Sequence, residues 1–208
     1  MSSSRNPVPE GKFRQLGSEL VRKGIHILIA LVPGLAALNR SYTALFLMGG
    51  VLFYSWAEGL RFVGFSPPLV SNVTRAVLRK QEQGRFALGP VTLGLGALLA
   101  LLLFPPRVAA VAVYALAFGD SAATLVGRFL GRVRPAFMAG KSLEGSLACF
   151  VAAALAAFFV FRDWKIALGT GLASMLAEAL PLGDSLGDFD NLLLPLAAGT
   201  AVLVLLLL

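Results

Sequence analysis

Long apolar runs, separated by short charged or proline-rich segments, dominate the pattern of this chain. About 20 helical residues cross a bilayer core of roughly 30 Å, and seven runs approach that length. The pattern therefore predicts an all-α integral membrane protein, a bundle of about seven transmembrane helices plus one interfacial helix. The expected transmembrane helices cover Glu19 to Leu38, Tyr42 to Leu60, Leu88 to Phe104, Val108 to Gly127, Leu143 to Phe161, Lys165 to Leu180 and Asn191 to Leu208.

The composition agrees with lipid as the main solvent of the chain. Hydrophobic residues make up 57% of the 208 residues and charged residues only 14%, which is unlike ordinary soluble domains. Residues 1–18 are polar, and no small-residue cleavage site follows them, so we expect no signal peptide. We predict a cytoplasmic tail over residues 1–18 and a single membrane domain over residues 19–208. The single cysteine, Cys149, excludes an intramolecular disulfide and is expected to be a buried small hydrophobe.

The basic residues give the expected orientation. Fourteen of the 18 Lys and Arg residues fall in the N-terminal segment and in the first two loops on the same side of the predicted bundle. Because cytoplasmic loops collect Lys and Arg, we expect the N-terminus inside and the C-terminus outside. The connections on the other side are too short to build a site, so the chemistry is expected at the cytoplasmic face. The net charge of +7 is dispersed between apolar spans, which argues against nucleic acid as a partner.

The segment from Ser66 to about residue 82 has a different pattern. Ser66 can cap a helix and Pro67 suits its first turn. Leu69, Val70, Val73 and Val77 share one face, which predicts an amphipathic helix in the inner interface. A solvated connector is the alternative.

Ionisable groups inside apolar helices are the main functional signal, because each costs energy without a partner or a role. The first span carries four ionisable residues at spacings of three, four and seven, which put them on one side of a helix. They are Glu19, Arg22, Lys23 and His26. Such a cationic stripe can hold phosphate, or it can anchor the helix at lipid headgroups. His26 alone is more often a packing residue than a catalyst.

In the fourth span, Asp120, Thr124, Gly127 and Gly131 share a face that leads to Arg128. The glycines are also typical of a helix-packing seam, but that interpretation does not account for Asp120. A carboxylate above a small-residue surface, flanked by guanidinium groups, suits a magnesium-bound nucleotide.

At the start of the fifth span, Lys141 can contact phosphate and Ser142 can cap the helix, whose N-terminus favours anions. The glycine spacing of a P-loop is absent. At the end of the sixth span, Ser174 and Glu178 are one turn apart, and Asp184, Asp188 and Asp190 follow. These acids can hold a divalent cation, although the loop does not match an EF-hand and a solvated acidic loop is the alternative for Asp184 and Asp188.

Together these clusters resemble the polyprenol kinase superfamily, the CTP-dependent membrane kinases that include dolichol kinase, phytol kinase and yeast-type diacylglycerol kinase. They occur in the family's order and cover almost the whole chain. The segments that carry the resemblance are Glu19-Leu-Val-Arg-Lys-Gly-Ile-His26, Gly119-Asp-Ser-Ala-Ala-Thr-Leu-Val-Gly-Arg128, Lys141-Ser-Leu-Glu-Gly-Ser146, Glu178-Ala-Leu-Pro181, and Asp190-Asn191 with Pro195.

The resemblance implies transfer of the γ-phosphoryl group of CTP, or of another nucleoside triphosphate, to the hydroxyl of a membrane lipid with Mg²⁺. Phosphoryl transfer depends chiefly on positioning and charge neutralisation. We expect Asp120 with Asp190 or Asn191 to hold Mg²⁺, and Arg22 and Lys23 to neutralise the transferring group. The proton acceptor is one of Glu178, Glu144 and His26. The expected nucleotide-binding residues are Gly119, Thr124, Gly127, Arg128, Lys141, Ser142, Glu144, Gly145, Ser146 and Asn191.

Three points stay open at the level of sequence. The acceptor is a polyprenol, a phytol-type alcohol or diacylglycerol. A phosphatidate cytidylyltransferase would also bring CTP to a membrane lipid, but its characteristic C-terminal signature is absent. A small transporter is the non-enzymatic alternative, because buried acids also mark ion pathways. Glu58 is a weaker candidate for the site that can simply pair with Arg61.

Overall fold

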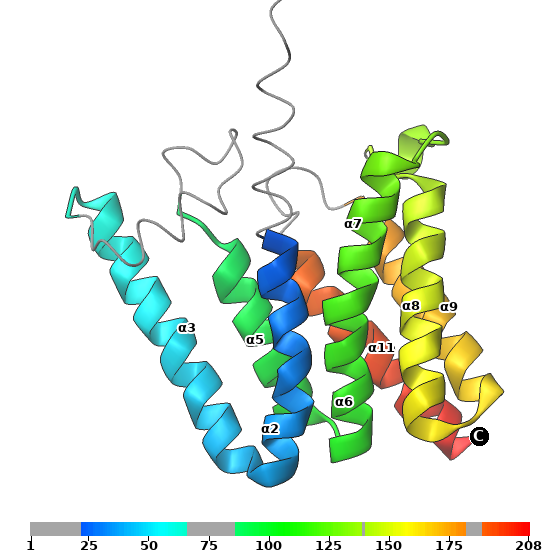
Figure 1. The fold of residues 1–208 in the computed structure, drawn as a ribbon, viewed down its shortest axis with the longest axis horizontal. Helices are drawn as coiled ribbons and strands as arrows, with labels where there is room; N and C mark the ends of the chain where they lie inside the picture. The colour runs from blue at the N-terminus through cyan, green and yellow to red at the C-terminus, as the bar shows by residue number, and fades with distance from the viewer. Residues whose placement is uncertain (1–21, 66–85, 139, 182–188) are drawn as a thin grey trace, which may run out of the picture.

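A computed structural model describes residues 22–65, 86–138, 140–181 and 189–208 of the chain (Figure 1). The described residues form helices and no strand. The expected interfacial helix over about residues 66–82, the tail over residues 1–18, and Glu19, Asp184 and Asp188 lie outside the described residues. The helices are α2 (Val32–Leu38), α3 (Arg40–Phe62), α5 (Gly89–Leu103), α6 (Pro106–Tyr114), α7 (Asp120–Phe129), α8 (Leu143–Phe161), α9 (Trp164–Ala179) and α11 (Asp190–Leu207).

The all-α membrane fold predicted from the sequence is confirmed, and a helix occupies the described part of each predicted span. By length and composition, four helices can cross a membrane: Arg40–Arg61, Pro106–Phe129, Leu143–Phe161 and Asp190–Leu207. Gly89–Leu103 is a shorter apolar helix. The number of seven crossings therefore stays a prediction.

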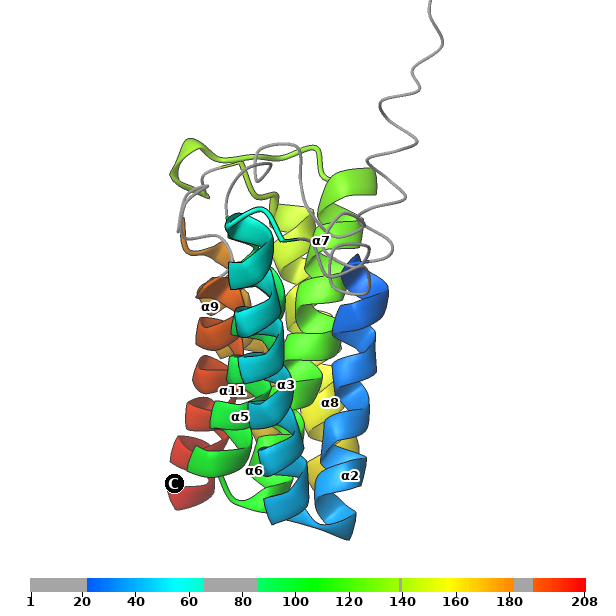
Figure 2. The ribbon, with the colours of Figure 1, turned by 90° about the vertical axis from the view of Figure 1, so that its left-hand side faces the viewer.

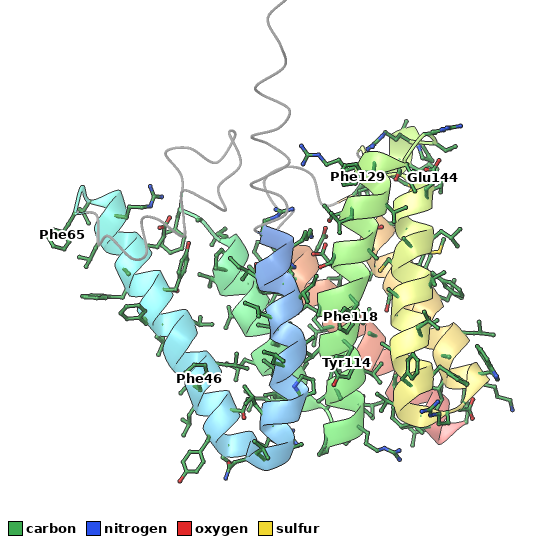
Figure 3. The ribbon with its side chains drawn as sticks, viewed as in Figure 1. Phe46, Phe65, Tyr114, Phe118, Phe129 and Glu144 are labelled. Atoms are coloured by element: carbon green, nitrogen blue, oxygen red, sulfur yellow. The ribbon has the colours of Figure 1, made fainter. Side chains whose placement is uncertain are left out.

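The outer surface of the bundle is apolar. Phe46 on α3 is 76% exposed and points away from the other helices (Figure 3). Exposed Leu and Phe side chains also occur on α8 and α11. Soluble monomers rarely expose so large an apolar surface to water. This distribution therefore fits a protein surrounded by lipid. The interior is packed mainly by small residues, and Val111, Ala112 and Val113 of α6 are fully buried.

The first helical segment changes its winding near a proline. Residues 22–28 are α-helical, and a 3₁₀ turn (η1, Ile29–Leu31) joins them to α2. Pro33 lacks an amide N–H, and its ring crowds the carbonyl four residues earlier, which belongs to Ile29. The helix continues through this tightened turn, so Lys23 and His26 lie on the same helical rod as α2.

A π-helical segment lies between α6 and α7. This segment (η3, Ala115–Gly119) ends directly before Asp120 and makes Pro106–Phe129 one continuous rod. Single π-helical turns inside α-helices frequently occur at functional sites. Here Asp120 is the first residue after the π-helical segment.

Short caps fix the turns between the helices. Ser142 Oγ accepts a hydrogen bond of 3.1 Å from Gly145 N at the start of α8, which confirms the predicted cap. At the other end of the bundle, Asn39 caps α3 and Asp163 caps α9. Successive rods run in opposite directions, so the first described helical turns, the end of α7, the start of α8, the end of α9 and the start of α11 lie at the same end (Figures 1 and 2).

Candidate active site

The first polar cluster joins the N-terminal helical rod to α7. Lys23 donates a hydrogen bond to Asp120 Oδ2, and His26 Nδ1 lies 2.8 Å from the same oxygen. Lys23 and His26 are only 2% and 5% exposed. A buried charge of this kind is tolerated when it is paired. The cluster therefore brings together three of the residues that the sequence predicted, across 97 positions of the chain.

The second polar cluster joins the start of α8 to α9 and α11. Lys141 Nζ donates to Asp190 Oδ2 at 2.8 Å and to the backbone carbonyl of Glu178, and it lies 3.8 Å from Glu178 Oε1. Ser146 donates a 2.6 Å hydrogen bond to Glu178 Oε2 within the bundle. Lys141, from the loop before α8, thus meets Glu178 of α9 and Asp190 of α11, and Ser146 of α8 joins the cluster through Glu178.

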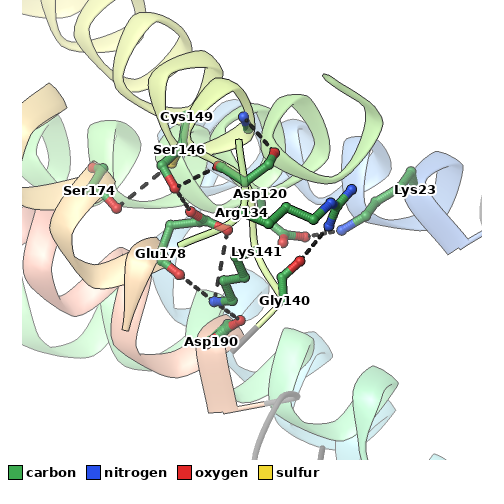
Figure 4. A network of polar contacts seen from close by, with 12 residues as sticks. Lys23, Asp120, Arg134, Gly140, Lys141, Ser146, Cys149, Ser174, Glu178 and Asp190 are labelled. Atoms are coloured by element: carbon green, nitrogen blue, oxygen red, sulfur yellow. Dashed lines mark hydrogen bonds and ion pairs between the residues drawn. The ribbon is translucent and has the colours of Figure 1, made fainter. Parts of the chain in front are cut away.

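The two clusters are neighbours at one end of the bundle (Figure 4). Asp190 interacts electrostatically with Lys141, Asp120 and Glu178. Cys149, a buried free thiol on α8, interacts electrostatically with Asp120 of the first cluster and with Glu178 and Asp190 of the second. The site therefore contains two lysines and three carboxylates in a largely buried setting.

The loop before α8 is held in place by two side chains. Glu144 accepts hydrogen bonds from the backbone N–H groups of Arg132 at 2.9 Å and Val133 at 3.1 Å. Arg134 donates to Gly127 O at 2.7 Å and to Gly140 O. This loop delivers Lys141 to the second cluster, so Glu144 and Arg134 position it. Arg134 was not predicted as a site residue from the sequence, because its partners are backbone carbonyls that no residue pattern reveals.

The glycines that the sequence assigned to nucleotide binding lie at helix contacts. A Cβ atom on Gly145 would lie 2.7 Å from Ala123 O, and one on Gly127 would lie 2.9 Å from Ser142 Oγ. A Cβ atom on Gly119 would lie 3.1 Å from Cys149 Sγ. These positions let α7 and α8 pack closely, which is the packing role considered for Gly127 from the sequence.

We predict that Gly145→Ala lowers thermal stability more than it affects nucleotide binding. The added methyl group forces α7 and α8 apart, and overpacking of this kind costs about 1–3 kcal/mol. Thermal unfolding in detergent measures the loss. Gly49→Ala in α3 is the matched control, because no atom lies within 4 Å of a Cβ atom there. An unchanged unfolding temperature with a raised KM for CTP would instead support a direct role in phosphate binding.

The other predicted residues are distributed around this end. Arg22 is partly buried, Arg128 is exposed on the last turn of α7, and Thr124 is partly buried one turn after Asp120. Asn191 points to α5, where its amide nitrogen donates to Thr92 Oγ1 at 3.0 Å and to Gly89 O at 3.4 Å. The first cluster and Asn191 therefore have different partners in this structure.

Glu58 lies outside both clusters. Its carboxylate is fully buried and accepts two hydrogen bonds from Arg61, at 2.8 and 2.6 Å, and one from Ala87 N at 2.9 Å. The pairing with Arg61 that the sequence suggested is therefore present. These contacts tie the end of α3 to the start of α5.

Two carboxylates have the features needed to hold a divalent cation. Within the described ranges, no group of three or more His, Cys, Asp or Glu side chains forms a ready-made metal site. Mg²⁺ at a phosphate, however, needs only one or two protein carboxylates, because substrate oxygens and water complete its shell. Asp190 Oδ1 is buried without a hydrogen-bond partner, and both contacts of Asp120 use Oδ2. One oxygen on each carboxylate thus fits a cation bound with the nucleotide.

Comparison with known proteins finds two similar kinases. A CTP-dependent diacylglycerol kinase 1 from Eremothecium gossypii is 39% identical over 83 residues, which cover 40% of this chain and 26% of that protein. The protein of the same name from Schizosaccharomyces pombe is 26% identical over 166 residues, covering 72% of this chain and 71% of that protein. No family model and no solved structure matches the chain. The matches confirm the resemblance that the motifs predicted.

Proposed function

We propose that this relative of the CTP-dependent diacylglycerol kinases is a membrane lipid-alcohol kinase that transfers the γ-phosphoryl group of CTP to diacylglycerol or a related lipid alcohol. The observation that carries the proposal is the meeting of two lysine–aspartate pairs, Lys23–Asp120 and Lys141–Asp190, at one end of the helical bundle. Phosphoryl transfer needs this combination of cations for phosphate and carboxylates for a metal.

We propose that the two pairs exchange partners when the nucleotide binds. In the structure, each lysine neutralises one aspartate. With nucleotide, Lys23 and Lys141 would turn to phosphate oxygens, and Asp120 and Asp190 would hold Mg²⁺. Bound Mg²⁺ supplies further neutralisation of the charge on the phosphate oxygens. The exchange leaves none of these four charges unpaired at either stage. The metal proposal rests on Asp120 and Asp190, because the Asn191 side chain is directed to α5 by its contacts with Gly89 and Thr92.

His26 is the favoured acceptor for the proton of the lipid hydroxyl. Its Nδ1 lies 2.8 Å from Asp120 Oδ2, so a proton on Nδ1 would face this carboxylate and Nε2 would be left as the base. Glu178 already accepts a hydrogen bond from Ser146, and Glu144 accepts two from the loop backbone. We therefore place His26 first among the three acceptors that the sequence left open.

The positive-inside pattern supports a cytoplasmic position for this end of the bundle. Arg128, Arg132 and Arg134 are exposed there, where they can contact the triphosphate and the lipid headgroups. The nucleotide would then enter from the cytoplasm, and the acceptor hydroxyl would arrive from the inner leaflet. The bilayer is thus a partner as well as a solvent.

Labelled nucleotide tests the proposal directly. Purified protein in mixed micelles is incubated with Mg²⁺ and γ-labelled CTP, ATP or GTP, with diacylglycerol, phytol, a polyprenol and phosphatidate offered in turn. We expect label in the lipid with CTP and diacylglycerol. Label in pyrophosphate, formed only with phosphatidate as acceptor, would support a cytidylyltransferase instead. Absence of transfer to all acceptors would contradict the kinase proposal.

A further inference from the structure

An open cavity of about 380 Å³ lies between α2, α6 and the end of α5. It occupies the end of the bundle opposite the candidate active site, next to the α2–α3 and α5–α6 turns. Its walls consist mainly of small apolar residues, Gly34 and Ala37 on α2 and Ala109 and Ala110 on α6. The polar clusters do not use this cavity, so its role is separate from the reaction chemistry.

The cavity is open on the α2 side. Gly34 and Ala37 are exposed, and no atom lies within 4 Å of a Cβ atom built on Gly34. Tyr114 lines the cavity from the last turn of α6 and stacks on Phe118, with ring centroids 5.9 Å apart. Both aromatic residues are labelled on α6–α7 in Figure 3. The result is an apolar groove along the lipid-exposed surface of the bundle.

Two arginines line the turn end of this groove. Arg40 donates to Phe104 O at 3.0 Å and also to Leu101 O, and Arg107 donates to Val160 O at 3.1 Å. These contacts fix the direction of the two guanidinium groups. They use only some of the five N–H donors of each group. Arg40 is the first residue of α3 and Arg107 the second of α6, so both lie at the ends of apolar helices, where arginine side chains commonly reach lipid headgroups.

We propose that this groove binds an anionic phospholipid of the adjoining leaflet. One acyl chain lies along the small residues of α2 and α6, and the phosphate contacts Arg40 and Arg107. Guanidinium groups match phosphate oxygens in charge and geometry. A free phosphate ion would leave the apolar length of the groove unused, and two cations favour a headgroup with net negative charge over a zwitterionic one.

The position of the groove gives the bound lipid a structural effect on the candidate active site. The rod that contains α2 begins with Lys23 and His26, and the rod that contains α6 continues into Asp120. A lipid between these rods braces the two elements that meet at Asp120. Only this effect on catalysis rests on the proposed function, whereas binding of the lipid does not require it.

Lipid retention in native mass spectrometry tests the proposal on the full chain. Protein in detergent is exposed to equal amounts of phosphatidylglycerol and phosphatidylcholine. We expect the wild type to retain phosphatidylglycerol preferentially. Gly34→Leu fills the groove and is expected to lose this retention, and Arg107→Gln is expected to lose the preference for the anionic lipid. Gly49→Leu is the matched control, because Gly49 is an equally open helical glycine on α3.

Equal retention of the two lipids by the wild type would overturn the proposal, as would unchanged retention by Gly34→Leu and Arg107→Gln. Because Arg107 is exposed, its variant keeps the test valid if Gly34→Leu does not fold. Loss of kinase activity plays no part in this readout. A failed lipid-binding test therefore leaves the kinase proposal standing, and a failed kinase assay leaves this site standing.

Discussion

Asp120→Asn is expected to lower lipid phosphorylation on the order of 100- to 1,000-fold, as seen when a preorganised electrostatic contact to a transition state is removed. Asparagine keeps the shape of the side chain and loses its negative charge. In our proposal it then holds Mg²⁺ poorly and no longer orients His26. The measurement is the initial rate of transfer from γ-labelled CTP to diacylglycerol, with thermal unfolding measured in parallel.

Asp120 also neutralises Lys23, which is 2% exposed, so stability has to be separated from catalysis. The double variant Lys23→Met, Asp120→Asn removes both charges together. If the pair has only a structural role, this variant regains activity along with its stability. In our proposal it regains stability and stays inactive. Asp163→Asn, which keeps a capping side chain at the other end of the bundle, is expected to retain activity and is the matched control.

The helices of this protein could be predicted because their signal is local. An apolar run bounded by charges or prolines determines a membrane helix, and the predicted span from Leu143 to Phe161 coincides with α8. The cap by Ser142 could also be predicted from the sequence, since its partner lies three residues away. The η3 segment before Asp120 could not be predicted, because a single π-helical turn does not change the pattern of so uniformly apolar a run.

The partners within the site could be predicted only as a set. Lys23, Asp120, Lys141 and Asp190 were predicted as site residues because they are charged and lie within apolar helices or at their ends, where an unpaired charge is costly. Which lysine meets which aspartate depends on how distant helices pack, and Lys23 and Asp120 are 97 positions apart. The sequence therefore indicated which residues belong to the site and left their pairing open.

The glycines show the opposite difficulty. The spacing of Gly127 on the Asp120 face suited both a phosphate-binding surface and a packing seam. The structure places Gly127 and Gly145 against each other across the α7–α8 contact. Small residues permit close approach by any group, and the sequence does not say whether that group is a ligand or another helix.

Lys141→Met is expected to raise the KM for CTP about 10- to 100-fold, the range set by hydrogen bonds to charged groups of about 1.5–3 kcal/mol. Lys141 reaches Asp190 and the Glu178 carbonyl from the loop before α8, and in our proposal it turns to a phosphate when CTP binds. Lys141→Arg keeps the charge and is expected to restore part of the affinity. Initial rates over a CTP titration at saturating diacylglycerol give the KM.

The same variant distinguishes nucleotide binding from a purely structural role. If Lys141 only neutralises Asp190, Lys141→Met lowers the unfolding temperature and leaves the KM for CTP unchanged, and adding Asp190→Asn restores the stability. In our proposal the KM rises while the KM for diacylglycerol changes little, because the lysine contacts the triphosphate and not the acceptor. Lys165→Met, at an exposed position in the first turn of α9, is the control expected to behave as the wild type.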